Sequence, residues 1–233
     1  MGWILLIVVL IILWLVAYWQ LVIAEGAYLG RRVVTLLYDW TAHRYNRLKG
    51  FDEDDEDWFL GHPLATALSE WNQPRVLDVA TGTGRLLCTL LRQPGVEGNM
   101  IGLDLSAKML RIASQYVVGR QGQAGLIRAA ATLLPFADEQ FEAVTCLEAL
   151  EFFDDAPAAL DEMVRVLRPG GWLLITNRIG WEARLLPGRA WSRAQLVSIL
   201  RRLPLTDISV RPWQTYYDLI WARKRGQIRE DTI

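Results

Sequence analysis

The chain has 233 residues, of which 52% are hydrophobic, and its 25 basic and 26 acidic side chains leave a formal net charge of −1. A near-neutral chain lacks the basic excess of a nucleic-acid-binding protein, so we expect no nucleic acid among its partners. Because the chain contains two cysteines and two histidines, we also expect neither a disulfide nor a metal site.

Residues 2–24 contain no charged side chain, and residues 3–23 consist almost wholly of Ile, Leu, Val and Trp. An apolar run of roughly 20 residues predicts a helix that crosses a membrane. Trp3 and Trp19, near its two ends, suit the two bilayer interfaces. The alternatives are a cleaved signal peptide and a buried core helix. A signal peptide is disfavoured because a basic leader and a small-x-small cleavage site are both missing.

Basic residues follow this apolar run, at Arg31, Arg32, Arg44, Arg47 and Lys49. By the positive-inside rule, they predict that the rest of the chain lies on the cytoplasmic side of the membrane. We therefore expect a single-pass membrane protein with a cytoplasmic C-terminal part of roughly 200 residues, which is enough for one α/β domain.

A connector at residues 24–74 precedes that domain. Its first part, residues 25–50, is expected to be helical, and residues 57–71 read as an amphipathic helix. Six consecutive acids at 52–57 predict a solvated loop or a helix N-terminus. A cation site is the less favoured alternative, since the run lacks the alternating ligand spacing of a calcium loop.

The most informative motif is an apolar run at 76–80 that ends in the glycine turn Gly82-Thr83-Gly84 and is followed by a helical pattern at 85–92. About 20 residues further on, Asp104 ends the next apolar run, where a carboxylate can accept hydrogen bonds from ribose hydroxyls. A dinucleotide site needs a third small residue where this chain has Leu87, so a phosphate ligand is disfavoured.

Short apolar strands then alternate with helices, which predicts a mostly parallel sheet covered on both faces. The last two strands are joined too tightly for a parallel crossover, so we expect them to form an antiparallel hairpin at the sheet edge. The predicted strands are 76–80, 100–104, 124–128, 141–147, 172–176, 208–211 and 217–223, and the predicted helices are 85–92, 107–118, 157–167 and 193–203.

The pattern from Asp78 to Gly84, Asp-x-x-x-Gly-x-Gly, resembles the first motif of class I S-adenosylmethionine (SAM) methyltransferases. Ser106 after Asp104, Leu134-Pro135-Phe136 and the run from Val166 to Gly171 resemble further motifs of that family. The pattern Tyr38-Asp39-x-x-Ala42-x-x-Tyr45 resembles the aromatic helix that closes over SAM in one branch of the family, the methyltransferases of ubiquinone and menaquinone biosynthesis. The resemblance implies SAM as cofactor and a Rossmann-like α/β fold, with seven strands and an antiparallel last strand.

The domain division that follows is an anchor at 3–23, the connector at 24–74, a methyltransferase domain at 75–225 and a tail at 226–233. The resemblance also implies roles for single residues in this domain. Backbone groups of Ala80, Gly82 and Gly84 would contact the methionine part of SAM, Asp104 the ribose and Leu105 the adenine. Leu147 would lie beneath the methyl group. Asp78 would orient the turn or the amino group, or be purely structural.

Two departures from the family concern the base and the adenine. Relatives often place a histidine after the fourth strand, where this chain has Glu151. Relatives often carry an acid beside the adenine, where this chain has Ala130 and Ala131, so Thr132 and Leu133 are expected to pack there instead. The general base is unknown. Glu148 and Glu151 are the candidates, because their i, i+3 spacing would put them on one face of a helical turn. The alternative is two solvated carboxylates.

Two segments have open assignments. Tyr38, His43 and Tyr45 would line a lid over SAM or dock the connector onto the domain. Residues 178–202, rich in Arg, Trp and Leu, would form a substrate wall, a membrane-docking face or an ordinary amphipathic surface.

Together these patterns predict a membrane-anchored SAM-dependent methyltransferase that acts on a lipophilic small molecule, such as a quinone precursor or a lipid. One alternative is a catalytically silent methyltransferase-like scaffold at the membrane. Another is a methyltransferase acting on a membrane-associated protein.

Overall fold

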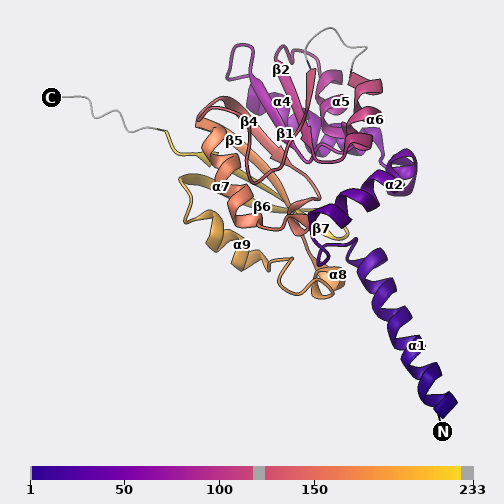
Figure 1. The fold of residues 1–233 in the computed structure, drawn as a ribbon. Helices are drawn as coiled ribbons and strands as arrows, with labels where there is room; N and C mark the ends of the chain where they lie inside the picture. Colours follow the sequence, from indigo (N-terminus) through magenta and orange to yellow (C-terminus); the bar gives the residue numbers. More distant parts are fainter. Residues whose placement is uncertain (1, 118–123, 227–233) are drawn as a thin grey trace.

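The computed structural model describes residues 2–117 and 124–226 (Figure 1). The C-terminal tail expected at 226–233 lies outside the described residues from position 227 onward, as does Val118, the last residue of a predicted helix. In the described part, a sheet with helices on both of its faces forms the body, and a long N-terminal helix projects away from it.

One seven-stranded sheet organises this body, in the order β3-β2-β1-β4-β5-β7-β6. Neighbouring strands from β3 to β5 are parallel, whereas β7 is antiparallel to both β5 and β6. The predicted Rossmann-like sheet with an antiparallel last strand is therefore confirmed, and β6 and β7 form the expected hairpin at one edge. The strands are β1 Arg75–Val79, β2 Asn99–Asp104, β3 Ala124–Arg128, β4 Phe141–Cys146, β5 Leu167–Arg178, β6 Leu205–Gln214 and β7 Tyr217–Lys224.

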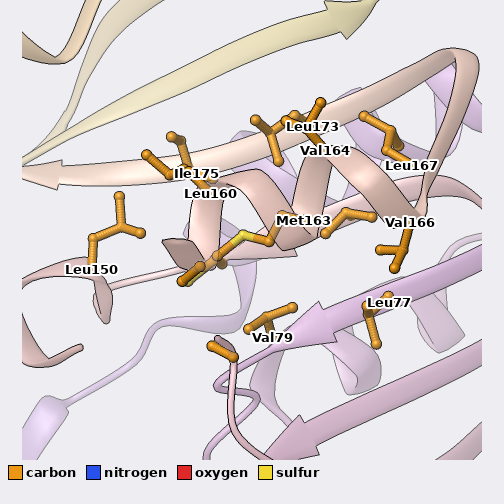
Figure 2. Packing of buried hydrophobic residues seen from close by; sticks show 14 of the residues in the cluster. Leu77, Val79, Leu150, Leu160, Met163, Val164, Val166, Leu167, Leu173 and Ile175 are labelled. Carbon is orange, nitrogen blue, oxygen red and sulfur yellow. The ribbon is translucent and has the colours of Figure 1, made fainter. Parts of the chain in front are cut away.

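Alternation along the strands sends apolar side chains into two core layers, one on each face of the sheet. From β1, Leu77 and Val79 belong to the layer under α7, whereas Val76 belongs to the layer on the opposite face. Figure 2 shows Leu160 and Met163 of α7 above this strand, with all four residues buried. The helices packed on the two faces include α5 Arg85–Arg92, α6 Ala107–Val117, α7 Ala156–Val166 and α9 Arg193–Leu200.

The N-terminal helix runs without a break from Gly2 to Ile23, as α1 Gly2–Tyr18 followed by the π-helical turn η1 Trp19–Ile23. Its mean hydropathy is 2.7, and none of its residues is buried inside the protein. The alternative of a buried core helix is therefore wrong. By length and composition this helix can cross a membrane, and a signal sequence has the same properties.

The connector folds onto the body through α2 Arg31–Lys49, α3 Glu53–Glu56, η2 Asp57–Gly61 and α4 His62–Leu68. The acidic run is a helix N-terminus, as predicted. Asp52 caps α3, where its carboxylate accepts hydrogen bonds from the backbone N–H groups of Asp54 and Asp55 at 2.9 and 3.2 Å. The expectation that all six acids are solvated is wrong for Glu56, which is buried and pairs with Arg85 at 3.0 Å.

Candidate active site

A cavity of about 220 Å³ opens at the carboxyl ends of β1, β2 and β4, where the strand order reverses. Open α/β sheets bind ligands at this kind of position. The cavity is lined mainly by the segments that follow β1, β2, β3 and β4, and α2 forms one wall. The sequence-predicted site residues that line this cavity are Ala80, Gly82, Asp104, Leu105, Leu147 and Glu148.

The glycine turn after β1 has three residues in the left-handed region, with φ of 57° at Ala80, 55° at Gly82 and 80° at Gly84. A Cβ at Gly82 would meet no protein atom within 4 Å, whereas a Cβ at Gly84 would lie 3.1 Å from the Cβ of Ala113 on α6. The two glycines therefore differ in purpose. Gly82 borders open cavity, and Gly84 permits close packing of the turn against a helix.

The N–H groups of both glycines in this turn donate to acceptors within the protein. Gly82 N donates to Asp104 Oδ2 at 2.9 Å, and Gly84 N donates to the carbonyl oxygen of Thr81 at 2.9 Å. These two N–H groups are therefore not free to bind a phosphate at the turn.

Asp104 is fixed at the end of β2 by two backbone donors. Besides Gly82 N on Oδ2, Ser106 N donates to Oδ1 at 2.8 Å. Burial raises the pKa of Asp104, and these N–H groups oppose the rise. Each carboxylate oxygen keeps one lone pair, so the group can accept two further hydrogen bonds from a diol in the cavity.

Asp78 lies deeper than Asp104, beside a smaller cavity of about 40 Å³ under the glycine turn. Its carboxylate accepts a hydrogen bond from Thr145 Oγ1 of β4 at 2.7 Å, and burial raises its pKa to about 6. This contact joins β1 to β4 beneath the turn, which is a structural role that sequence analysis left open.

Glu148, two residues after the end of β4, is a buried carboxylate at the centre of an ion-pair network. Its two oxygens lie 3.0 Å from Arg85 Nη1 and 2.9 Å from Lys49 Nζ. Arg85 in turn pairs with Glu56 and stacks over Phe51, with its guanidinium carbon 4.0 Å from the ring centre. Burial alone would raise the pKa of Glu148, but Arg85 and Lys49 outweigh it and lower the pKa. A carboxylate stabilised in its ionised form is a weak proton acceptor.

Glu151 has different partners from Glu148. It is buried, it accepts a hydrogen bond from the Tyr217 hydroxyl, and it lies 3.6 Å from Arg178 Nη1. Burial raises its pKa. The expectation that Glu148 and Glu151 share one helical face is wrong. Glu148 lies before the 3₁₀ turn Leu150–Phe152, and its own backbone is in the left-handed region, with a φ of 51°.

α2 is held over the cavity by polar contacts along its inner face. Asp39 accepts a hydrogen bond from Ser106 Oγ at the start of α6, and Asn46 Oδ1 accepts one from Thr83 Oγ1 at 2.6 Å. Lys49 at its end joins Glu148. Tyr38 and Tyr45 line the cavity, as the lid hypothesis expects.

His43, by contrast, is exposed. Sequence analysis missed the contribution of Val34, Thr35 and Asp39 to this side of the site. Their spacing of three or four residues from Tyr38, Ala42 and Tyr45 is the helical signal that marks one face of α2.

Ala130, Ala131 and Thr132, where the resemblance led us to expect an acid, line the cavity, as Leu105 does. The role expected for Leu133 is wrong, since this side chain is 77% exposed. An apolar wall of small residues leaves space for a flat ring to pack.

The fold and this cavity define a class of protein, the Rossmann-like proteins that hold a ligand at the switch point of the sheet. Comparison with known families narrows the class. Residues 77–175 match the model of the family described as "Methyltransferase domain".

A demethylmenaquinone methyltransferase of Lactiplantibacillus plantarum is 36% identical over 170 residues, which are 72% of this chain and 72% of that protein. Another from Lactobacillus johnsonii is 38% identical over 49% of this chain and 52% of its own length. The chain spans about half the length of the first curated relatives that it matches.

Solved structures support the fold. A SAM-dependent methyltransferase from Aquifex aeolicus has a TM-score of 0.57 at 19% identity and covers 75% of this chain, with 99% of its own length matched. The [4+2]-cyclase SpnF has a TM-score of 0.70 at 20% identity and covers 84% of this chain, with 97% of its own length matched. The chain belongs to the class I SAM-dependent methyltransferases, and SAM is the methyl donor of this family.

The two glycines of the turn give a first prediction. Gly82→Ala places a methyl group in the cavity without meeting protein atoms, so SAM should bind at least tenfold more weakly, which is about 1.4 kcal/mol. Both variants carry the strain of a positive φ, but Gly84→Ala should lower the free energy of unfolding further, by roughly 2 kcal/mol in all, because its Cβ also meets Ala113. Equilibrium dialysis of tritiated SAM and urea unfolding measure the two effects. Equal loss of SAM affinity in both variants, with equal stability, contradicts the assignment.

A second prediction concerns the pH dependence of stability. The Asp78 carboxyl keeps its proton up to about pH 6 in the folded chain, whereas its ordinary pKa is 3.8. Its contribution to the free energy of unfolding is therefore largest below pH 4 and falls by roughly 3 kcal/mol as the pH rises through 6. Asp78→Asn should lose that part of the decrease. Urea unfolding of both proteins between pH 4 and 7.5 measures it, and parallel profiles would contradict it.

Proposed function

We propose that the chain is a membrane-anchored methyltransferase that transfers the methyl group of SAM to a lipophilic small molecule on the cytoplasmic side. The observation that carries this proposal is the position of the cavity relative to the N-terminal helix. Residues 24–30 alone separate this membrane-length helix from α2, and α2 is a wall of the cavity. The basic residues at the start of α2 support the cytoplasmic orientation.

In this proposal the methyltransferase domain comprises residues 75–225. The carboxylate of Asp104 accepts the ribose hydroxyls, Leu105 packs on the adenine, and Ala80, Gly82 and Gly84 shape the turn around the methionine part. Asp78 supports the turn from beneath. The donor set fits SAM, since the cavity combines an anchored carboxylate for the ribose with apolar walls for the adenine.

Bound SAM supplies an electrophilic methyl group on a sulfonium, whose departure leaves a neutral thioether. The protein then has to align the acceptor with that methyl group and exclude water. Tyr38, Tyr45 and Phe152 enclose the cavity on the α2 side, and Leu147 borders it at the end of β4. Glu148 holds α2 in place through Lys49, so we assign it a positioning role rather than that of a base.

A lipophilic acceptor agrees with these walls. The cavity reaches from the glycine turn to Phe153 and to Val34 on α2, so an apolar ring or chain can extend along it away from the carboxylate. The relatives named as demethylmenaquinone methyltransferases point to a quinone as one acceptor to test. Tethering to the membrane raises the local concentration of any acceptor dissolved there.

Transfer of radioactive methyl groups tests the proposal. The full chain, reconstituted in vesicles made from a membrane lipid extract, receives methyl-tritiated SAM, and label is counted in the lipid and protein fractions. We expect label in the lipid fraction, reduced at least a hundredfold by Asp104→Ala. Label confined to the protein fraction would contradict the small-molecule acceptor. Label in neither fraction, with SAM bound, would favour a silent scaffold.

A further inference from the structure

α2 has an outer face that the cavity does not use. Leu36 and Trp40 lie on it, with 66% and 74% of their side chains exposed. Arg32, Arg44 and Arg47 extend the same face toward the two ends of the helix, and all three are exposed. Large apolar side chains flanked by arginines along one helix face are typical of a helix that lies in a membrane interface.

The arginines of this helix differ from many others in the chain. Within residues 2–117 and 124–226, Arg31, Arg32, Arg44 and Arg47 have no ion-pair partner, whereas Arg85 lies between two carboxylates. An unpaired guanidinium next to apolar surface is suited to a phosphate group, to which it can donate two parallel hydrogen bonds.

The end of the N-terminal helix is fixed to the body close to α2. The Trp19 indole N–H donates to the carbonyl oxygen of Leu185 at 2.9 Å, and the Tyr28 hydroxyl donates to that of Pro187 at 2.8 Å. Figure 1 shows α2 starting beside the end of α1 and running in a different direction from it. The body is therefore held near the point where the apolar helix ends, with α2 at that side.

We propose that the outer face of α2 lies on the surface of an anionic bilayer. Leu36 and Trp40 enter the boundary between headgroups and acyl chains, and Arg32, Arg44 and Arg47 bind lipid phosphates. This inference rests on the proposed membrane span and adds a second contact to it. Since the inner face of α2 is the cavity wall, contact with the bilayer holds that wall in position.

A bilayer suits this face better than a second copy of the chain. A two-fold contact would bring the same unpaired arginines together, and like charges repel across an interface. Two apolar side chains also offer much less area than a stable dimer buries, which is on the order of 1,600 Å². In a bilayer, lipid phosphates neutralise the arginines, and the acyl-chain boundary takes up both apolar side chains.

A nitroxide on Trp40→Cys of the full chain in nanodiscs tests the proposal, in a Cys88→Ser background because Cys146 is buried. Its collision rates with oxygen, which concentrates in lipid, and with a water-soluble nickel chelate are compared in discs with and without phosphatidylglycerol. We expect the oxygen-to-nickel ratio to rise several-fold in anionic discs. A nitroxide on Asp161→Cys of α7, which is also exposed, should stay aqueous in both.

Charge reversal supplies the matched variants. Arg44→Glu/Arg47→Glu should return the label at position 40 to its aqueous ratio, whereas Arg201→Glu/Arg202→Glu, on exposed arginines elsewhere, should not. A label that is aqueous in both discs overturns the proposal, and so does one shielded from both reagents, which indicates a second protein copy. Co-elution of the chain with the discs reports on the anchor separately, so loss of the span is distinguishable from loss of the α2 contact.

Discussion

The ionised carboxylate of Glu148 holds together the parts of the protein that surround the cavity. It pairs with Lys49 at the end of α2 and with Arg85 at the start of α5, and Arg85 also binds Glu56 of α3. Because Glu148 is buried, loss of both Lys49 and Arg85 would leave its charge without compensation, at a cost of roughly 3–5 kcal/mol. The helix that covers the cavity is thus tied to the sheet by a charge that the interior cannot leave unpaired.

The sequence predicts the sheet and one edge of the site well, because these depend on local patterns. Alternating apolar runs predict the strands, and the spacing from the glycine turn to Asp104 predicts that both border one cavity. The partners of Glu148 could not be predicted in this way. Lys49 and Arg85 are 99 and 63 residues away in the chain, and only the folded sheet brings them together.

The predictions that the structure contradicts also failed because they depend on tertiary contacts. Glu56 reads as one more solvated acid in an acidic run, yet the tertiary position of Arg85 makes it a buried partner. From the sequence, Leu133 is expected to pack beside the adenine, but the loop directs its side chain outward, where it is exposed to solvent. The inner face of α2 is visible as helical periodicity, although periodicity alone does not say which element it packs against.

The apolar helix Gly2–Ile23, the helix α2 and the cavity are neighbours in the structure, in the same order as in the sequence. Under the proposed function, this order brings the membrane close to the cavity, so that an acceptor dissolved in the bilayer has a short path to the methyl group. The same helix thereby serves two environments, with aromatic and polar side chains toward the cofactor site and arginines, Leu36 and Trp40 on the outside.

The central claim is that the cavity beneath α2 is the SAM site, with Asp104 as its ribose acceptor. Calorimetric titration of SAM and S-adenosylhomocysteine into the full chain and into Asp104→Ala tests it most directly. The account predicts one site per chain with micromolar affinity for both ligands, lost in the variant while its thermal unfolding is retained. A folded wild-type chain that binds neither ligand, or a variant that binds them equally well, would contradict it.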